Sequence, residues 1–358
     1  MQLPFYPIFE LTRGEIIEST HYGAIAVVDS HGKTIASYGD PLAVAFLRSS
    51  AKPFQVLPFV ERGGVEHFGF TQQELALACA SHEGSDKHVR VVETMQSKVG
   101  VDESYLQCGS HMPGDVSAYK RLIKNDEAPT PNRNNCSGKH TAMLAHAKMR
   151  GLSLDTYLEP DHPIQQDILA SFEEMCLFPS NQIHLGIDGC SAPNFAVPLL
   201  NSALAYARLC DPHTLSETRA SSCRKITSAM MAYPEMISSA TEFDCRLIRV
   251  GAGKIVCKRG AEGYQAIGLL PGAIHADSPG IGIAIKIMEG DLGQRKLDLT
   301  AYSRVRPAVT LEILKQLGAL SEAQLKELTE FGPVKPVTNH RGIVVGESKP
   351  IFTLEQHN

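Results

Sequence analysis

The chain of 358 residues has a net charge of -5, with 43% hydrophobic and 20% charged residues, a mixture typical of a globular protein with ample core material. It contains no basic block for nucleic acid or an anionic membrane, and no apolar run near the ~18 residues of a membrane span. The start lacks the features of a secretory signal, and the nine cysteines include no C-x-x-C pair, so we expect a cytoplasmic protein with reduced thiols.

Strand signals dominate the beginning of the chain. Residues 1–45 read as β-rich, and two such runs within 14–40 are joined by the turn residues of 29–33. Residues 49–64 then predict a helix, because a serine cap is followed by apolar residues three and four apart and a Gly-Gly stop. Pro53 would lie in the first turn of this helix, where a missing N–H costs little.

Helical patterns dominate the middle of the chain, where apolar residues recur about every 3.6 residues. The predicted helices are 71–82, 86–100, 138–151, 163–176 and 194–210. After about residue 240 the pattern returns to strands, and a last helix follows. The β-rich runs are 247–270 and 280–291, and the helix is 305–318.

This order of elements predicts an α/β (α+β) fold with one antiparallel sheet built from both ends of the chain. The sheet region comprises 1–70 and 236–358, and the region 71–235 is a helical insertion. We expect the two regions to form one compact catalytic unit.

Ser49 and Lys52 form an S-x-x-K pattern at the expected start of a helix. Residues three apart share a helix face, so the lysine amine can reach the serine hydroxyl. A desolvated amine can accept the hydroxyl proton, and the N–H groups at a helix start favour a developing oxyanion. For an isolated match, a capping serine followed by a surface lysine is the more common interpretation.

Two further elements accompany S-x-x-K in serine acyl-enzymes, a serine-led triplet and a late Lys-x-Gly strand. Here Ser81 follows an apolar helical run in "ASHEG", and Lys258 lies in "VCKRGAEG". The order agrees with that plan, although His82 and Glu83 replace the Asp and Asn of the triplet, and Arg259 replaces a threonine. A second pair, Ser81 with Lys258, is therefore plausible, and a helix-end cap and a solvated strand lysine are the alternatives.

Cys136 and Cys190 lie in loops rich in Asn, Gly and Ser, unlike cysteines within apolar runs. Two thiolates and one nitrogen would make a three-ligand zinc site with an open position. By spacing, His140 is the better third ligand, because Lys139 must first lose a proton. Two unconnected thiols are an equally weighted alternative.

A cysteine nucleophile is a further possibility, since it needs a histidine and an orienting amide or carboxylate. His140, Asn135 and Asp188 are available for these roles. Asp188 lies between glycines, two residues before Cys190. Its carboxylate would orient a ligand, bind a cationic group of the substrate, or stabilise a tight turn.

Five motifs together resemble one family. "LRSSAKPFQ", "SHEG", "NNCSGKHTAML", "IDGCSAPNFAVPL" and "CKRGAEG" are similar, in matching order, to the rhizobial-type L-asparaginases, the asparaginase II family. The resemblance extends from about residue 7 to residue 350. It implies a fold like that of the serine β-lactamases and the hydrolysis of L-asparagine to L-aspartate and ammonia.

The resemblance also implies roles for particular residues. Ser49 would pair with Lys52, and Ser81 with Lys258. Zinc would be held by Cys136, Lys139 and Cys190, with support from Asp188 and a water, and would position the substrate rather than supply the attacking water. This replaces the preference for His140, since a nearby metal lowers the pKa of an amine. Arg48, beside the serine, is placed to meet the substrate carboxylate.

The leading hypothesis is therefore a cytoplasmic, homodimeric L-asparaginase that acts on the free amino acid through a lysine-activated serine beside a zinc site. A β-lactam- or D-Ala-peptide-type serine acyl hydrolase is the alternative, and the missing export signal disfavours it. A non-enzymatic zinc-stabilised scaffold would not need two Ser–Lys sets. We expect the protein to bind a small-molecule substrate, and we do not expect it to bind nucleic acid or a membrane.

Overall fold

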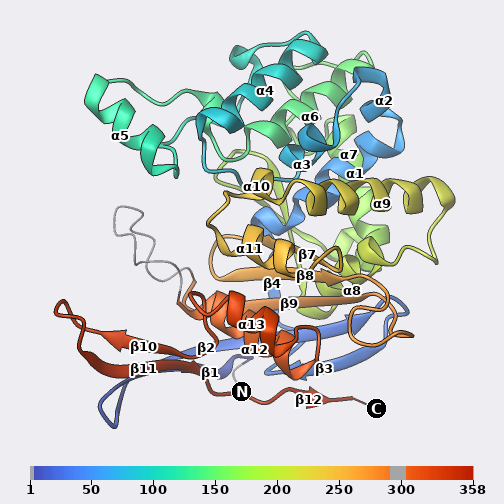
Figure 1. Cartoon of the computed structure of the whole chain (residues 1–358). Helices are drawn as coiled ribbons and strands as arrows, with labels where there is room; N and C mark the ends of the chain where they lie inside the picture. Colours follow the sequence, from blue (N-terminus) through green and yellow to red (C-terminus); the bar gives the residue numbers. More distant parts are fainter. Residues whose placement is uncertain (1–3, 291–303, 358) are drawn as a thin grey trace. The chain divides into compact units, whose positions relative to one another are not determined.

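Strands from both ends of the chain form one antiparallel sheet (Figure 1). The computed structural model describes residues 4–290 and 304–357, and nine strands within these ranges belong to the sheet. They are β1 (Tyr6–Arg13), β2 (Ile16–Asp29), β3 (Thr34–Tyr38), β7 (Ile255–Arg259), β8 (Tyr264–Leu269), β9 (Ile281–Ile287), β10 (Lys335–Thr338), β11 (Val344–Pro350) and β12 (Glu355–Gln356). The order is β10-β11-β1-β2-β9-β8-β7, and β3 joins β2 to β12.

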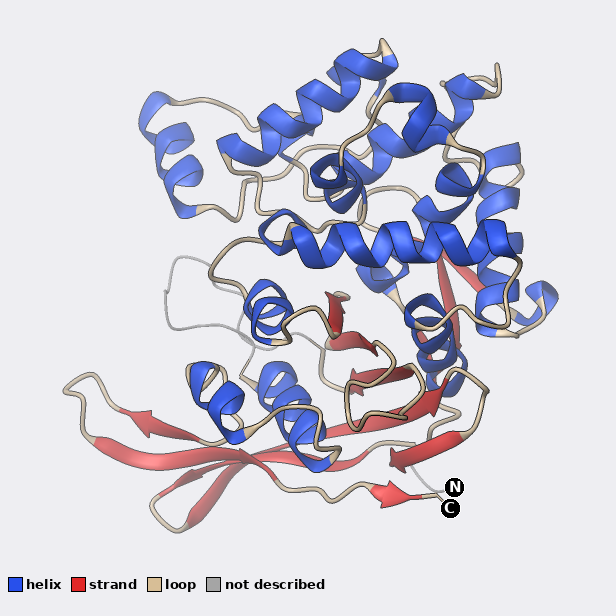
Figure 2. Cartoon of the chain, turned by 45° about the vertical axis from the view of Figure 1, so that its right-hand side comes forward, coloured by secondary structure: helices blue, strands red, loops and turns tan. Residues whose placement is uncertain are grey.

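Helices of the same unit lie against this sheet (Figure 2). Helix α8 (Leu199–Cys210) packs so closely that a Cβ at Gly282 would lie 1.7 Å from the Ala203 carbonyl oxygen. Helix α12 (Val305–Gln316) contacts β8 through a hydrogen bond from Arg306 to Gln265. Tyr264, the residue before Gln265 on β8, is hydrogen-bonded to Ser202 of α8. Because neighbouring residues of a strand point to opposite faces, α8 and α12 cover opposite faces of the sheet.

The second unit is mainly helical, with one β-hairpin. Its elements are α1 (Lys52–Glu61), α2 (Gly64–Phe68), α3 (Gln72–Ala78), α4 (Asp86–Val99), α5 (Val116–Asn125), α6 (Ser137–Met149), α7 (Pro163–Cys176), α9 (Glu217–Ala232), α10 (Pro234–Ile237), β5 (His184–Ile187), β6 (Pro193–Pro198) and the 3₁₀ turns η1 (Arg48–Ala51), η2 (Glu103–Tyr105), η3 (Pro131–Arg133) and η4 (Ser180–Gln182). Helix α6 contacts α1, α3 and α4. Its residues 137–147 are all buried, so α6 forms the centre of this unit.

The two units differ in their bounds from the predicted regions. The sheet unit comprises Met1–Leu47, Val197–Asp211 and Arg246–Asn358, and the helical unit comprises Arg48–Ala196 and Pro212–Cys245. Residues 48–70 join the helical unit because α1 packs on other helices there, whereas α8 joins the sheet unit. Whether both form one catalytic unit stays a prediction.

Most predicted elements are present, and the fold class expected from the sequence is confirmed. The helix predicted for 163–176 has the bounds Pro163–Cys176, and the one predicted for 305–318 is α12. The strand run 280–291 is β9, although Asp291 lies outside the described residues.

Three local predictions were wrong. The segment 194–210 begins as strand β6, and the helix starts only after Pro198, because the residue before a proline favours extended backbone. Residues 247–250 form the end of helix α11 (Phe243–Val250) instead of the start of a strand. A short apolar run is compatible with both the helical and the strand periodicity. The N-cap of α1 is Ala51, without a side-chain hydrogen bond, instead of a serine.

The remaining elements are strand β4 (Val44–Phe46) and helix α13 (Glu322–Glu327). Within residues 4–290 and 304–357, no helix is both long enough and apolar enough to cross a membrane. All nine cysteines are free thiols, as the lack of cysteine pairs in the sequence predicts.

Candidate active site

Lys52 connects three segments of the helical unit. It is the first residue of α1 and is fully buried. Its Nζ donates hydrogen bonds to the Ala80 carbonyl oxygen, to Ser81 Oγ at 2.9 Å and to the Asn135 carbonyl oxygen at 3.3 Å. All three of these partners are oxygens, from two backbone carbonyls and one hydroxyl. The amine therefore holds the Ser81 loop against the loop that precedes α6.

Ser49 lies in the 3₁₀ turn η1, directly before α1, and is partly exposed. Lys52 lies at the helix start, as the S-x-x-K spacing predicts. Its hydrogen bond, however, goes to Ser81, and within the described part of the chain no hydrogen bond joins Lys52 to the Ser49 hydroxyl. Ser49 is thus a partly exposed serine three residues before a buried lysine.

Lys258 lies on β7, in the sheet unit, and is fully buried. Its Nζ donates to the carbonyl oxygen of Arg259 at 2.9 Å. The structure therefore excludes the alternative that Lys258 is a solvated strand residue. The pairing of Lys258 with Ser81, which lies in the other unit, stays a prediction.

A close helix crossing fixes the position of Ser81. A Cβ at Gly138 would lie 2.4 Å from the Leu77 carbonyl oxygen, so only glycine lets α3 approach α6 this closely. Helix α3 ends at Ala78, and the Ser81 N–H then donates to the Ile237 carbonyl oxygen at 2.9 Å. Two neighbouring helices therefore position the serine through its backbone.

His82 connects two loops of the site, a role that the sequence did not indicate. It is buried, and its Nδ1 accepts a hydrogen bond from the Gly84 N–H at 3.1 Å. The proton is therefore on Nε2, which donates to Ser137 Oγ at 2.9 Å. Burial lowers the pKa of His82 well below its usual value, and the ring stays neutral. This bridge joins the residue after Ser81 to the residue after Cys136.

Cys136, Lys139 and Cys190 lie near one another in the same unit, and each is at most 4% exposed. Cys136 is the N-cap residue of α6, and Lys139 lies in its first turn. Cys190 lies in the β5–β6 turn, where Lys139 Nζ reaches its sulfur at 3.1 Å. Tertiary folding thus brings together two thiols that are far apart in sequence.

The charges in this cluster are coupled. The neighbouring Cys136 thiol lowers the pKa of Cys190 far below its usual range, against the effect of burial, and the Lys139 ammonium lowers it further. The same interaction raises the pKa of Cys136, whose thiol donates to Asn135 Oδ1 at 3.1 Å. Burial lowers the pKa of Lys139, but Cys190, Cys136 and Asp188 raise it more, and the net shift is upward. The result is a buried thiolate–ammonium pair.

Two sulfurs and one amine nitrogen are suitable donors for a soft divalent cation such as zinc. Within residues 4–290 and 304–357, no three His, Cys, Asp or Glu side chains are grouped to hold a metal, so a site here requires the amine of Lys139. The donor set fits zinc, provided that Cys136 and Lys139 release their protons on binding. Zinc stays a prediction.

His140, the ligand favoured by spacing, is occupied differently. Its Nδ1 lies 2.6 Å from the hydroxyl of Tyr157, which accepts the Gln107 N–H at 3.0 Å. Burial raises the pKa of Tyr157 and lowers that of His140, so both groups are neutral, and we assign the phenol as the donor because a proton on the other ring nitrogen stabilises the Cys190 thiolate. The ring proton is then on Nε2, which is buried and has no hydrogen-bond partner of normal geometry. The interaction of this ring with Cys190 stabilises the Cys190 thiolate. His140 therefore presents a proton, and not a lone pair, to the cluster.

Arg48 and Asp188 form an ion pair beside these groups. Arg48 Nε donates to Asp188 Oδ1 at 2.8 Å, and the side chains are 28% and 10% exposed. Asp188 is held further by the Gly189 N–H at 2.8 Å and by Asn194 Nδ2 at 3.0 Å. Arg48 has a left-handed backbone, with φ of 52°, directly before Ser49. Such strain in a non-glycine residue is common at functional sites.

The comparisons with known proteins concern the chain as a whole and not its individual site residues. A family model described as L-asparaginase II matches residues 9–350. No curated protein matches the chain in a sequence comparison. Among solved structures, the chain is similar to a probable glutaminase of Bacillus subtilis, with TM-score 0.39 and 10% identity over 83% of this chain and 89% of that one.

Two other solved structures are similar at the same level. A Bacillus glutaminase in the presence of 4.3 M NaCl gives TM-score 0.37 and 12% identity over 82% of this chain and 90% of that one. Mglu in its glutamate form gives TM-score 0.35 and 15% identity over 83% of this chain and 61% of that one. These TM-scores are too low to define a fold, which the sheet topology defines instead. The match over residues 9–350 shows that the chain belongs to the L-asparaginase II family and is therefore an amidohydrolase.

Proposed function

We propose that the protein hydrolyses L-asparagine to L-aspartate and ammonia. The observation that best supports this proposal is the buried Lys52 amine, which is hydrogen-bonded to Ser81 Oγ at 2.9 Å and directly follows the turn containing Ser49. A serine hydroxyl becomes a nucleophile when a nearby amine can take its proton. Family membership gives the amide as the bond that is cleaved.

The charged pair of Arg48 and Asp188 supports a free amino acid as the substrate. The pair offers a cation and an anion 2.8 Å apart on partly exposed side chains. An α-carboxylate is complementary to the guanidinium, and an α-ammonium is complementary to the carboxylate. A zwitterionic amino acid meets both requirements, whereas an internal residue of a peptide has neither charge.

In the proposed reaction, Ser49 attacks the side-chain amide carbon and its proton passes to Lys52, which must enter the step as a neutral amine. Ser81, held by Lys52, keeps the amine in place and relays protons to the departing nitrogen. Ammonia leaves, and water then cleaves the acyl-enzyme to give L-aspartate. Lys258 would assist Ser81 from β7. The proposal thus gives both Ser–Lys sets a role.

Zinc is proposed as the resident metal, held by Cys136, Lys139 and Cys190. When bound, it would act as a Lewis acid that orients the substrate. The chain's own contribution is to keep the donors together, with His82 bridging the loops and Tyr157 fixing the tautomer of His140. The homodimer and the cytoplasmic location expected from the sequence also stay predictions.

Ammonia release from a panel of free amino-acid amides tests the function. L-asparagine should be hydrolysed, and its N-acetyl and methyl-ester derivatives should fail because each lacks one charge of the zwitterion. Acylation by penicillin serves as the control for a β-lactam-type serine hydrolase. Stable penicillin acylation without ammonia release from L-asparagine would replace the proposal with that alternative.

A further inference from the structure

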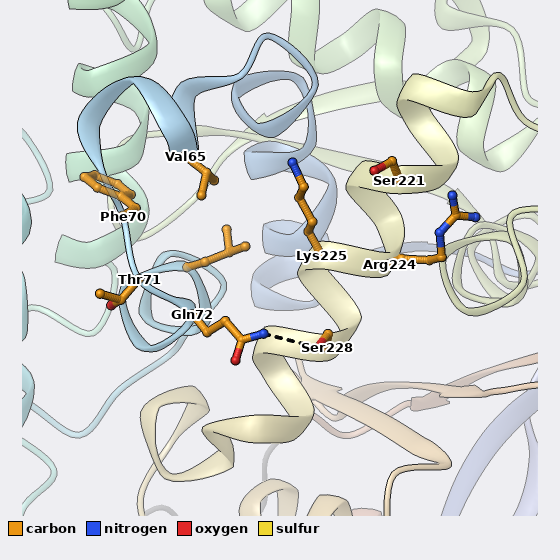
Figure 3. Close-up of a pocket in the computed structure, with 9 residues that line it drawn as sticks. Val65, Phe70, Thr71, Gln72, Ser221, Arg224, Lys225 and Ser228 are labelled. Atoms are coloured by element: carbon orange, nitrogen blue, oxygen red, sulfur yellow. Dashed lines mark hydrogen bonds between the residues drawn. The ribbon is translucent and has the colours of Figure 1, made fainter.

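A pocket of about 470 Å³ lies in the helical unit, between α9 and the segment from α2 to α3 (Figure 3). Its lining residues are distinct from those of the candidate active site. Val65, Phe70 and Leu75 form an apolar wall. Its volume falls within the range of about 300–1,000 Å³ that is common for small-molecule sites. The pocket is therefore large enough for a ligand that buries one apolar group.

The opposite wall of the pocket is polar and comes from a single helix. Ser221, Lys225 and Ser228 are four and three residues apart and so share one face of α9. Gln72 Nε2 donates to Ser228 Oγ at 3.4 Å, which joins α3 to α9 at one end (Figure 3). Hydroxyl and amide groups are thus available beside the apolar wall.

An ion pair joins α9 to α2 beside the apolar wall. Lys225 Nζ lies 2.6 Å from Glu66 Oε1, and Glu66 directly follows Val65. The two side chains are 44% and 56% exposed, so their pairing contributes little to stability and can be exchanged for ligand contacts. In Figure 3, Lys225 extends along the pocket, whereas the end of Arg224 extends away from Phe70.

A ligand with one charge that displaces this ion pair would leave either Lys225, which lines the pocket, or Glu66, which lies beside it, without its partner. A zwitterion satisfies both, because its carboxylate meets the lysine and its ammonium meets the glutamate. An apolar substituent on the same molecule would lie against Val65, Phe70 and Leu75. We propose that this pocket binds a free α-amino acid with an apolar side chain.

A ligand in this pocket would contact two helices that position the backbone of Ser81. The ligand would contact α3 through Leu75, and α3 ends three residues before Ser81. It would also contact α9, which is followed by α10, whose Ile237 carbonyl oxygen accepts the Ser81 N–H at 2.9 Å. Ligand binding should therefore slow hydrogen exchange of the segment 79–84.

Calorimetric titration of the full chain with L-phenylalanine tests the proposal. We expect L-phenylalanine to bind, and 3-phenylpropionate, phenethylamine and L-alanine, which each lack one of the three features, to bind at least about fivefold more weakly. Lys225→Ala and Glu66→Gln should each weaken L-phenylalanine binding about five- to tenfold. Glu217→Gln, at an exposed position of the same helix that does not line the pocket, should change it by less than about twofold.

Three results would overturn the proposal. These are absence of L-phenylalanine binding up to about 10 mM, equal binding of 3-phenylpropionate, or unchanged binding to Lys225→Ala. Because the active site is itself proposed to hold an amino acid, Arg48→Ala must leave L-phenylalanine binding intact, and loss of binding there would place the ligand in that site. Lys225→Ala should retain L-asparagine hydrolysis, so failure of this proposal is distinct from failure of the proposed function. Unchanged exchange of 79–84 would remove only the link to Ser81.

Discussion

Two buried lysines of the helical unit, Lys52 and Lys139, lie in different chemical surroundings. Both lie in the first turn of a helix, and they are 0% and 1% exposed. The hydrogen bonds of the Lys52 amine within the described residues go to oxygens, from Ser81 and two backbone carbonyls. The amine of Lys139 contacts the sulfur of Cys190 at 3.1 Å, with Cys136 beside it.

The comparison shows that burial alone does not assign a function to a lysine. Oxygen acceptors from a serine and from carbonyl groups keep Lys52 in position to exchange a proton with a hydroxyl. Sulfur neighbours place Lys139 in a donor set that is suited to a soft metal. The two centres are connected, because His82 and the Lys52–Asn135 contact link the Ser81 loop to the loop of Cys136. Catalysis and metal binding should nevertheless respond to different substitutions.

The largest effect is expected for Ser49→Ala. Removal of the proposed nucleophile should lower kcat for L-asparagine by about 10⁴-fold or more while the fold survives. Ser81→Ala should cost less, about 10²- to 10³-fold, because it removes a proton relay. Steady-state ammonia release compares the two. If Ser49→Ala keeps a tenth of the wild-type turnover, the nucleophile is Ser81, which already contacts Lys52.

Lys52→Arg tests whether the oxygen-bound lysine must lose a proton. Arginine keeps the charge but stays protonated at every accessible pH, so kcat should fall by about 10²- to 10⁴-fold, nearly as far as in Lys52→Met. Zinc content should not change in either variant. Lys124→Arg, on an exposed position of α5, is the matched control. An active Lys52→Arg enzyme would exclude the lysine as a base.

Lys139→Met tests the sulfur-bound lysine. Wild-type protein should contain about one zinc ion per chain, and the variant should contain almost none, because the remaining two thiols give an incomplete donor set. Loss of the buried ammonium should also lower the free energy of unfolding by about 3 kcal/mol. Elemental analysis and denaturant titration measure these effects. Wild-type protein free of zinc, or a Lys139→Met variant with full zinc content, would contradict the assignment.

The smallest effect is expected for Tyr157→Phe. The substitution removes the O–H donor to His140 Nδ1, which should lower the free energy of unfolding by about 1 kcal/mol. The ring then loses its fixed tautomer beside Cys190, and zinc affinity should fall about tenfold. Tyr105→Phe, at a 40% exposed tyrosine, is the control. Equal zinc affinity in both variants would show that the histidine has no influence on the cluster.

Local sequence determined the elements of the site that lie within a few residues of one another. The S-x-x-K spacing places Lys52 at the start of α1, and Cys136 and Lys139 occupy the first turn of α6, because helix starts depend on nearby residues. Alternation and turn residues likewise predicted β2 and β3. The family motifs named the site residues, since their order along the chain is a property of the sequence.

Tertiary structure decided which groups meet. The partner of Lys52 is Ser81 because glycine at 138 lets α3 cross α6 closely, a condition that no local pattern contains. The role of His140 follows from Tyr157, which lies 17 residues away and fixes the ring proton. Strand β11 pairs with β1, and the short strand β12 pairs with β3, so both depend on strands from the start of the chain. Such contacts join distant segments, and their energy comes from packing that local propensity does not describe.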